Sequence, residues 1–230
     1  MLDLGAAFEA ESGVKLAPVF GPSGVLRERI ERGEHVDVFA SADMGHPQRL
    51  ADAGRSFPVI PFAYNRLCAL AAPKVVVTTA TLLERMLDST VKLGMSTPLA
   101  DPSGDYALQL FEKAEHLRPG AQAALTAKAR RLVGAADSPP PPKDRSVYAA
   151  LVAGGEADIF LTYCTNALVA QKEDPRLGVV QVPDALAVSA KYGLTLMKGA
   201  GPSAPAFADF VMSRRGQEIV ARHGFTPVPR

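Results

Sequence analysis

The sequence predicts an α/β fold divided into two lobes, and three observations support this expectation. Short apolar segments with strand character alternate with amphipathic helical segments through most of the 230 residues. The helix–turn–strand pattern around Gly33-Glu34 recurs around Gly155-Glu156, as two similar lobes would require. Residues 57–72 form a long, apolar, proline-containing stretch that suits a connection between lobes. The alternative for the repeat is that any two helix–strand units with a glycine at the helix end look alike.

The first half of the chain begins within a helical pattern, in which Leu4, Ala7 and Phe8 share a face and Gly13 ends the helix. Apolar runs predict strands, in order, at 14–20, 36–42, 57–72 and 91–96. Helical spacing of apolar residues predicts helices, in order, at 23–32, 43–53, 79–88, 105–117 and 119–130.

The second half continues the alternation and suggests where the chain changes lobe. Helices are expected at 145–153, 203–213 and 215–223, and strands at 158–163, 178–183 and 187–197. If the chain returns near residues 163–166, the lobes are linked twice. We therefore expect lobe I at 1–63 and 165–230, and lobe II at 64–164. Two mixed sheets flanked by helices would then share a double-crossover hinge, and hinged lobes commonly close on a ligand.

The composition excludes several classes of protein. Apolar residues make up 47% and charged residues 21%, which is typical of a globular rather than a disordered chain. A net charge of +1 creates no field that favours nucleic acid or an anionic membrane. No apolar run approaches the roughly 20 residues needed to cross a bilayer.

The sequence contains no recognisable catalytic or metal-binding constellation. In Gly21-Pro22-Ser23-Gly24-Val25 the second glycine stands one place too early for the G-x-S-x-G nucleophile elbow. No histidine has an obvious carboxylate partner, and no metal or nucleotide-binding motif occurs. Cys68 and Cys164 match no metal spacing, so they are either two buried thiols or one disulfide.

A small hydroxyl residue next to glycine recurs where a helix is expected to begin. Ser23 lies in "GPSG" and Ser103 in "DPSGDY". A helix N-terminus offers unpaired N–H groups and about half a positive charge, which together favour an anion. One such end contributes about 0.3–1 kcal/mol, whereas micromolar binding needs about −8 kcal/mol. Several ends must therefore converge, and each one alone reads as an ordinary N-cap or turn.

Three stretches, "AAFEAESGVKLAPVFGPSGVLRERIERGEHVDVFASAD", "DPSGDYA" and "GEADIFLTYCTNA", occur in this order over nearly the whole chain. In this the chain resembles the periplasmic molybdate-binding proteins of ABC importers. The resemblance implies a two-lobed periplasmic solute-binding fold with a ligand cleft between the lobes. It implies a monomer that binds molybdate or tungstate, works with a membrane permease, and needs no cofactor, no protein-bound metal and no nucleic acid. No enzymatic reaction is expected.

The resemblance also assigns roles to individual residues. Ser23 matches the family's oxyanion-binding serine, and Ser103 matches a position that donates its main-chain N–H. Tyr163 matches a tyrosine whose hydroxyl reaches the ligand. Arg145 falls where the family uses a backbone N–H at the start of a helix, and a shift of one residue would make Ser146 the match. Arg145 could equally be an ordinary solvated residue at a helix start.

The sequence departs from the family at two places. Pro22 removes one backbone donor beside Ser23. Family members begin with a strand ending in A-A-S-L, whose serine is a further ligand donor, and this chain starts about halfway along the helix that follows. The signal peptide, first strand and first ligand serine are therefore expected to be missing, through a late start codon or a curtailed protein with impaired binding.

Two alternatives to a molybdate importer component stay open. One is a module that binds a small carboxylate or another oxyanion, or senses it, on the same fold. An enzyme on the same scaffold is disfavoured because no nucleophile or acid–base pair emerges, although fold alone never settles function. Within the resemblance, Cys68 and Cys164 both flank the crossovers, so we expect them to lie close together.

Overall fold

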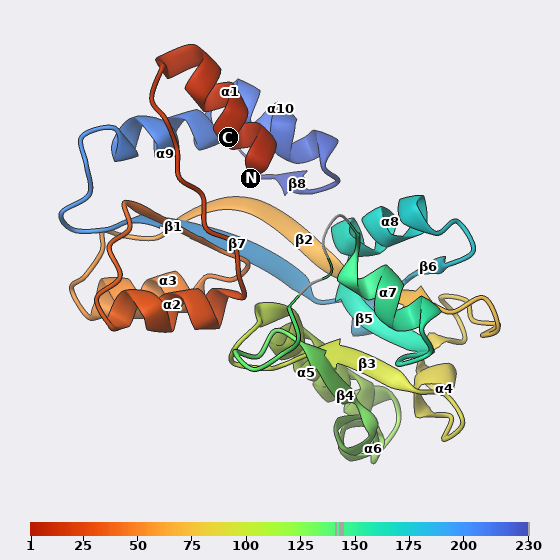
Figure 1. Cartoon of the computed structure of the whole chain (residues 1–230). Helices are drawn as coiled ribbons and strands as arrows, with labels where there is room; N and C mark the ends of the chain where they lie inside the picture. Colours follow the sequence, from red (N-terminus) through yellow and green to blue (C-terminus); the bar gives the residue numbers. More distant parts are fainter. Residues whose placement is uncertain (141, 143–144, 230) are drawn as a thin grey trace. The chain divides into compact units, whose positions relative to one another are not determined.

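The computed structural model describes residues 1–140, 142 and 145–229, which fold into two compact units (Figure 1). Unit 1 comprises Met1–Asn65 and Ala190–Arg230, and unit 2 comprises Arg66–Ser189. The chain therefore passes between the units twice. The first passage lies close to the expected boundary at 63/64. The second lies at 189/190, so that residues 165–189, which we expected in lobe I, belong to unit 2.

Unit 1 contains strands covered by helices on both faces. Its elements are α1 (Leu2–Ser12), α2 (Ser23–Glu31), β1 (Val38–Ser41), α3 (Gly45–Asp52), the first part of β2 (Ile60–Ala71), β7 (Ser189–Leu196), α9 (Ala204–Met212), α10 (Arg214–Arg222) and β8 (Thr226–Pro227). β1 pairs antiparallel with β7, and β8 pairs antiparallel with β2. Helices α1, α9 and α10 lie together on one face of these strands, and α2 and α3 lie on the other (Figure 1).

The core of unit 1 forms where α1, α9 and α10 meet the strands. Its aromatic centre is Phe8 of α1, whose ring contacts Phe207 and Phe210 of α9 at centroid distances of 5.2 and 5.6 Å. Leu4 and Phe8 are the buried residues of α1, as their shared helical face predicts.

Unit 2 contains the last part of β2 and the remaining elements. These are α4 (Leu82–Leu87), β3 (Leu93–Ser96), α5 (Pro102–Leu117), α6 (Ala121–Lys128), β4 (Arg130–Val133), α7 (Val147–Ala153), β5 (Ile159–Tyr163), α8 (Cys164–Glu173), β6 (Gly178–Gln181) and the 3₁₀-helix η1 (Asp184–Leu186). β3 pairs in parallel with β4 and β5, whereas β2 pairs antiparallel with β5 and β6. The sheet of this unit is therefore mixed, and the predicted α/β class is confirmed.

Packing explains why residues 165–189 belong to unit 2. Helix α8 packs against α7, β5 and β6, and β6 pairs with the last four residues of β2. The sequence alone predicted no helix at α8, whose residues CTNALVAQKE are mostly polar or small. It also missed β4, an arginine-containing strand of four residues.

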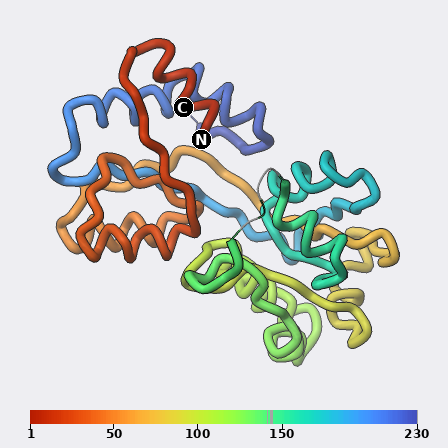
Figure 2. Tube along the Cα trace, viewed as in Figure 1, coloured from red at the N-terminus to blue at the C-terminus, as the bar shows by residue number. Residues whose placement is uncertain are grey.

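The predicted strand at 14–20 is wrong. These residues run without regular structure between α1 and α2, a path that the tube in Figure 2 follows. Val19 and Phe20 are exposed, with 54% and 59% of their surface accessible. The backbone N–H of Leu16 donates to the Glu9 carboxylate at 2.7 Å instead of to a neighbouring strand. Alternating apolar residues form a strand only where a partner strand lies alongside.

A disulfide joins Cys68 of β2 to Cys164, the first residue of α8, with 4.7 Å between the Cα atoms. The register of β2 and β5 sets Cys68 opposite Thr162 and so brings the end of β5 beside it. The expected proximity of the two cysteines is confirmed, and the alternative of two free thiols is excluded. The reason given for it is wrong for Cys164, because the second passage between the units lies at 189/190.

Candidate functional site

Ser23 is the first residue of α2 and connects this helix to the end of β1. Its buried hydroxyl oxygen accepts a hydrogen bond from the N–H of Ala42 at 3.2 Å. Pro22 at the N-cap offers no side-chain acceptor to the first turn of α2. A hydroxyl that accepts one hydrogen bond can still donate its own proton. Ser23 thus lies at a helix N-terminus, as the sequence predicted, next to the carboxyl end of a strand.

Ser103 lies in the first turn of α5. Its backbone N–H has a hydrogen-bond partner, whereas its side-chain hydroxyl has none among the described residues. Its N–H donates to Oδ1 of Asp101, the N-cap residue, at 3.0 Å. Its Oγ is fully buried and has no hydrogen-bond partner among the described residues. A buried hydroxyl without a partner costs about 1–3 kcal/mol, so such groups are uncommon and call for an explanation.

Glycines bring the start of α5 close to the strands. A Cβ on Gly104 would lie 2.6 Å from the carbonyl oxygen of Ser96, so only glycine lets α5 begin this near β3. Gly134 follows β4 and has a positive φ of +91°. Its backbone lies so close to Asp101 that a Cβ on residue 134 would be 2.6 Å from the Asp101 Cβ. The Asp101 carboxyl group is therefore enclosed between the backbone of residue 134 and the first turn of α5.

The Asp101 carboxyl belongs to a group of buried and half-buried polar side chains that we call the polar cluster. Its members are Ser96, Asp101, Ser103, Tyr148, Thr162 and Asn166. They come from β3, the N-terminus of α5, α7, β5 and α8. The side chain of Ser96 lies near both Asp101 and Tyr148, although its oxygen completes a well-aligned hydrogen bond with neither.

Burial shifts the two acidic groups of the polar cluster in the same direction. Burial raises the pKa of Asp101, the hydrogen bond from the Ser103 N–H opposes the rise, and the nearby charge of Asp105 adds to it. Burial, together with the charge of Asp101, raises the pKa of Tyr148 to about 12. Tyr148 is therefore a neutral hydroxyl at neutral pH.

Tyr163 is the last residue of β5 and packs against the same helix as the polar cluster. Its ring contacts Tyr106 of α5 edge-on, with 6.3 Å between the centroids and 68° between the planes. Both rings are buried. The structure therefore brings Tyr163 and Ser103 to neighbouring elements of unit 2, β5 and the first turns of α5.

Arg145 and Ser146, at the start of α7, are both engaged by Glu173 at the end of α8. Arg145 Nε donates to Oε1 of Glu173 at 3.3 Å, and the N–H of Ser146 donates to Oε2 at 2.5 Å. Ser146 Oγ in turn accepts from the N–H of Ala149 at 3.3 Å and caps the helix. A carboxylate of the chain itself thus occupies the backbone N–H of Ser146 and the side chain of Arg145.

The predicted site residues divide between the units. Ser23 belongs to unit 1, and Ser103, Tyr163, Arg145 and Ser146 belong to unit 2. Sequence reasoning missed Asp101 and Tyr148. Asp-Pro-Ser before a helix is an N-cap signal that could have identified Asp101. No local sequence signal identifies Tyr148, because its place in the polar cluster depends on residues that are distant in the sequence.

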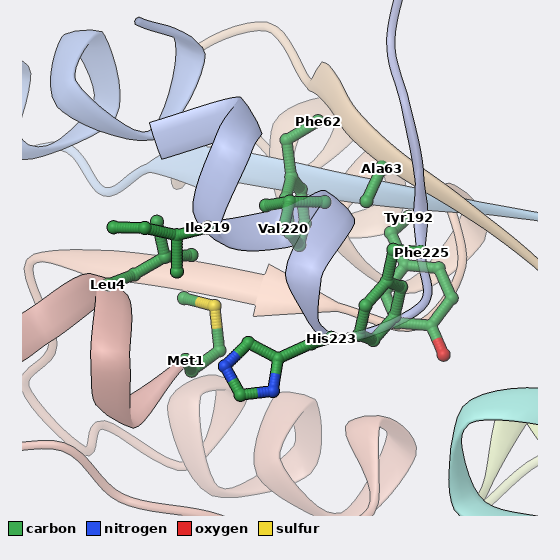
Figure 3. A pocket seen from close by; sticks show the side chains of 9 residues that line it. All are labelled: Met1, Leu4, Phe62, Ala63, Tyr192, Ile219, Val220, His223 and Phe225. Atoms are coloured by element: carbon green, nitrogen blue, oxygen red, sulfur yellow. The ribbon is translucent and has the colours of Figure 1, made fainter. Parts of the chain in front are cut away.

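Unit 1 also contains an apolar cavity of about 70 Å³, which Figure 3 shows from close by. Its lining residues come from α1 and the residue before it, from β2, β7 and α10, and from the segment after α10: Met1, Leu4, Phe62, Ala63, Tyr192, Ile219, Val220, His223 and Phe225. His223 Nε2 lies 2.9 Å from Asp3 Oδ2. The cavity contains none of the predicted donors, and its apolar lining does not suit an oxyanion.

Within 1–140, 142 and 145–229, no group of three or more His, Cys, Asp or Glu side chains could hold a metal ion. In the same residues, no helix combines the length and the hydropathy that a membrane span requires.

Comparisons with known proteins agree with this architecture. A family model described as "Bacterial extracellular solute-binding protein" matches residues 1–226. An uncharacterised protein of Pasteurella multocida is 38% identical over 176 residues, which are 76% of this chain and 73% of the relative. The molybdate-binding protein ModA of Escherichia coli is 25% identical over 237 residues, which cover 98% of this chain and 84% of ModA.

Solved structures of similar fold bind different anions. The periplasmic molybdate-binding protein of Azotobacter vinelandii is 18% identical with a TM-score of 0.76, covering 100% of this chain and 94% of that one. The sulfate-binding protein SubI of Mycobacterium tuberculosis is 18% identical with a TM-score of 0.78, covering 97% and 80%. The resemblance to molybdate-binding proteins and the solute-binding fold are thereby confirmed.

Proposed function

Because this chain belongs to the family of bacterial extracellular solute-binding proteins, we propose that it binds a tetrahedral oxyanion, molybdate or tungstate, as the solute-binding component of an ABC importer. The family consists of solute-binding proteins, and the proposed role includes no catalytic step. The proposed partner is the membrane permease of the importer.

The observation that carries the proposal is the hydroxyl of Ser103. It is fully buried at the N-terminus of a 16-residue helix and has no partner within the described part of the chain. An oxyanion at this position would accept the hydroxyl proton and gain from the positive end of the helix. Binding would also remove the penalty of about 1–3 kcal/mol that an unpaired buried hydroxyl carries.

We propose Ser23, Ser103 and Tyr163 as the principal donors. Each combines burial with a place at a strand end or a helix start. Arg145 and Ser146 are proposed as further donors, which would have to exchange Glu173 for the ligand.

A small carboxylate is the second candidate ligand, and one observation favours it. The N-terminus of α5 already accommodates a carboxylate, that of Asp101, and the start of α7 accommodates that of Glu173. Donors that suit these side chains also suit a carboxylate ligand of similar size.

The disulfide supports the proposed periplasmic location. Disulfides persist in oxidising compartments such as the bacterial periplasm and are rare in the reducing cytosol. The Cys68–Cys164 bond would be stable there. We also propose that the protein is a monomer and that it does not bind nucleic acid. A net charge of +1 is consistent with the second point.

The proposal is tested by thermal unfolding with molybdate, tungstate, sulfate, phosphate and small carboxylates. A ligand at 100 times its dissociation constant stabilises the folded protein by about 2.7 kcal/mol. We expect molybdate and tungstate to raise the melting temperature, and Ser23→Ala and Tyr163→Phe to weaken this effect. A panel in which only carboxylates stabilise the protein would replace the oxyanion with the second candidate. No stabilisation by any of these anions would contradict the proposal.

A further inference from the structure

Asp101 places a carboxyl group where the proposed function requires an anion. Its Oδ1 accepts the N–H of Ser103 at 3.0 Å, at the positive end of α5. A carboxylate and an oxyanion use the same donors at a helix N-terminus. The single proton of the Ser103 N–H is therefore already in use, and an ion that contacts the unpartnered Ser103 Oγ lies next to the Asp101 carboxyl.

The surroundings hold this carboxyl group in place. The backbone of Gly134 packs so closely that a Cβ there would lie 3.0 Å from Asp101 Oδ2. Two side chains of the polar cluster, those of Ser96 and Tyr148, also lie near it. The carboxyl group cannot swing away from an arriving ion without breaking the helix cap.

The titratable groups that face Asp101 supply no compensating positive charge within the described residues. Asp105, on the same helix, is acidic, and its carboxylate accepts the N–H of Leu99 at 3.0 Å. Tyr148, on α7, is neutral at physiological pH. Burial already raises the pKa of Asp101 in the free protein, and a bound dianion would raise it further because like charges disfavour ionisation.

We propose that the oxyanion binds at the N-terminus of α5 together with one proton, which the solvent supplies and Asp101 carries in the complex. The inference rests on the proposed function. The protonated carboxyl group donates its O–H to the ion, whereas the carboxylate would repel it. A pocket of neutral donors alone would bind molybdate without taking up a proton. Asp101 thus makes affinity depend on pH.

The sign of this dependence follows from linkage. Between the pKa of Asp101 in the free protein and its higher pKa in the complex, each bound ion brings up to one proton with it. The association constant therefore falls by up to tenfold for each unit by which pH rises through that window. Molybdate itself carries no proton near neutral pH, so the dependence belongs to the protein.

The test is a calorimetric titration of molybdate at a series of pH values from acid to alkaline, carried out at each pH in two buffers that differ in ionisation enthalpy. The difference in apparent binding enthalpy gives the number of protons taken up. We expect the wild-type protein to take up as much as one proton per ion. Asp101→Asn should take up none and bind with an affinity that is independent of pH, because asparagine caps a helix as well as aspartate does but does not titrate.

Asp209→Asn is the matched control, because Asp209 is exposed on α9 and its replacement removes the same charge. It should behave as the wild type does. If Asp101→Asn does not fold, Asp101→Ser replaces it, since serine is also a good cap. Molybdate binding without proton uptake, or equal uptake by Asp101→Asn and wild type, would overturn the inference and leave the proposed function standing. Absence of molybdate binding in every variant and in the wild type would overturn the proposed function itself.

Discussion

At the scale of single residues, the side chain of Ser103 is expected to contribute to ligand binding but not to the stability of the folded protein. Its Oγ is buried without a partner among the described residues, whereas its N–H is used by the Asp101 cap. The side chain therefore gives the folded protein no hydrogen bond and carries the cost of desolvation. The proposed function would give this hydroxyl a partner from outside the chain.

Ser103→Ala should leave the free energy of unfolding unchanged or raise it by about 1 kcal/mol, because it removes an unpaired buried hydroxyl. Its affinity for molybdate should fall about tenfold, the worth of one hydrogen bond of about 1.4 kcal/mol. Urea unfolding without ligand and calorimetry with molybdate measure the two effects.

Ser203→Ala is the control for this variant, because Ser203 stands at the N-cap of α9 without a side-chain cap bond. It should change neither quantity appreciably. A loss of more than about 2 kcal/mol of stability in Ser103→Ala would show that the hydroxyl has a protein partner after all, since that loss is in the range for a broken buried hydrogen bond.

At the scale of elements, the start of α7 depends on the end of α8. Glu173 accepts hydrogen bonds from the backbone of Ser146 and the side chain of Arg145. The sequence placed a helix start here correctly but gave no sign of Glu173, which lies 27 residues beyond Ser146. The pairing arises because α7 and α8 pack side by side (Figure 1).

Glu173→Gln removes the competing carboxylate from both proposed donors. We expect severalfold tighter molybdate binding, with a stability loss of about 1 kcal/mol from the weaker interaction at the helix start. Titration calorimetry and urea unfolding measure these effects. Glu156→Gln, which breaks an exposed ion pair with Arg130, is the control and should leave the affinity unchanged. Unchanged affinity in Glu173→Gln would remove Arg145 and Ser146 from the proposed donors.

At the scale of the whole molecule, the chain forms two compact units, and the disulfide lies within one of them. Cys68 and Cys164 both belong to unit 2. The bond spans 96 residues of sequence, and therefore most of that unit lies inside the covalent loop. Closing a loop of this size restricts the unfolded chain strongly in the entropic account.

Reduction of the disulfide should lower the free energy of unfolding by about 2–5 kcal/mol. Urea unfolding with and without a reductant measures this loss. In the double variant Cys68→Ser, Cys164→Ser the reductant should have no effect, because no disulfide remains. A wild-type protein that is equally stable in both conditions would show that the bond contributes nothing to folding.

The sequence by itself determined the alternation of helices and strands, the helix starts at Ser23 and near Ser103, and the absence of known catalytic motifs in its 230 residues. These are local properties, because helix periodicity, caps and motifs each span only a few neighbouring residues. Only the tertiary structure decided that 14–20 is not a strand and that residues 165–189 join unit 2. It also decided that Asp101 is enclosed beside Ser103. Burial, strand pairing and charge–charge contacts depend on residues that are far apart in the chain, and the packing of elements alone brings those residues together.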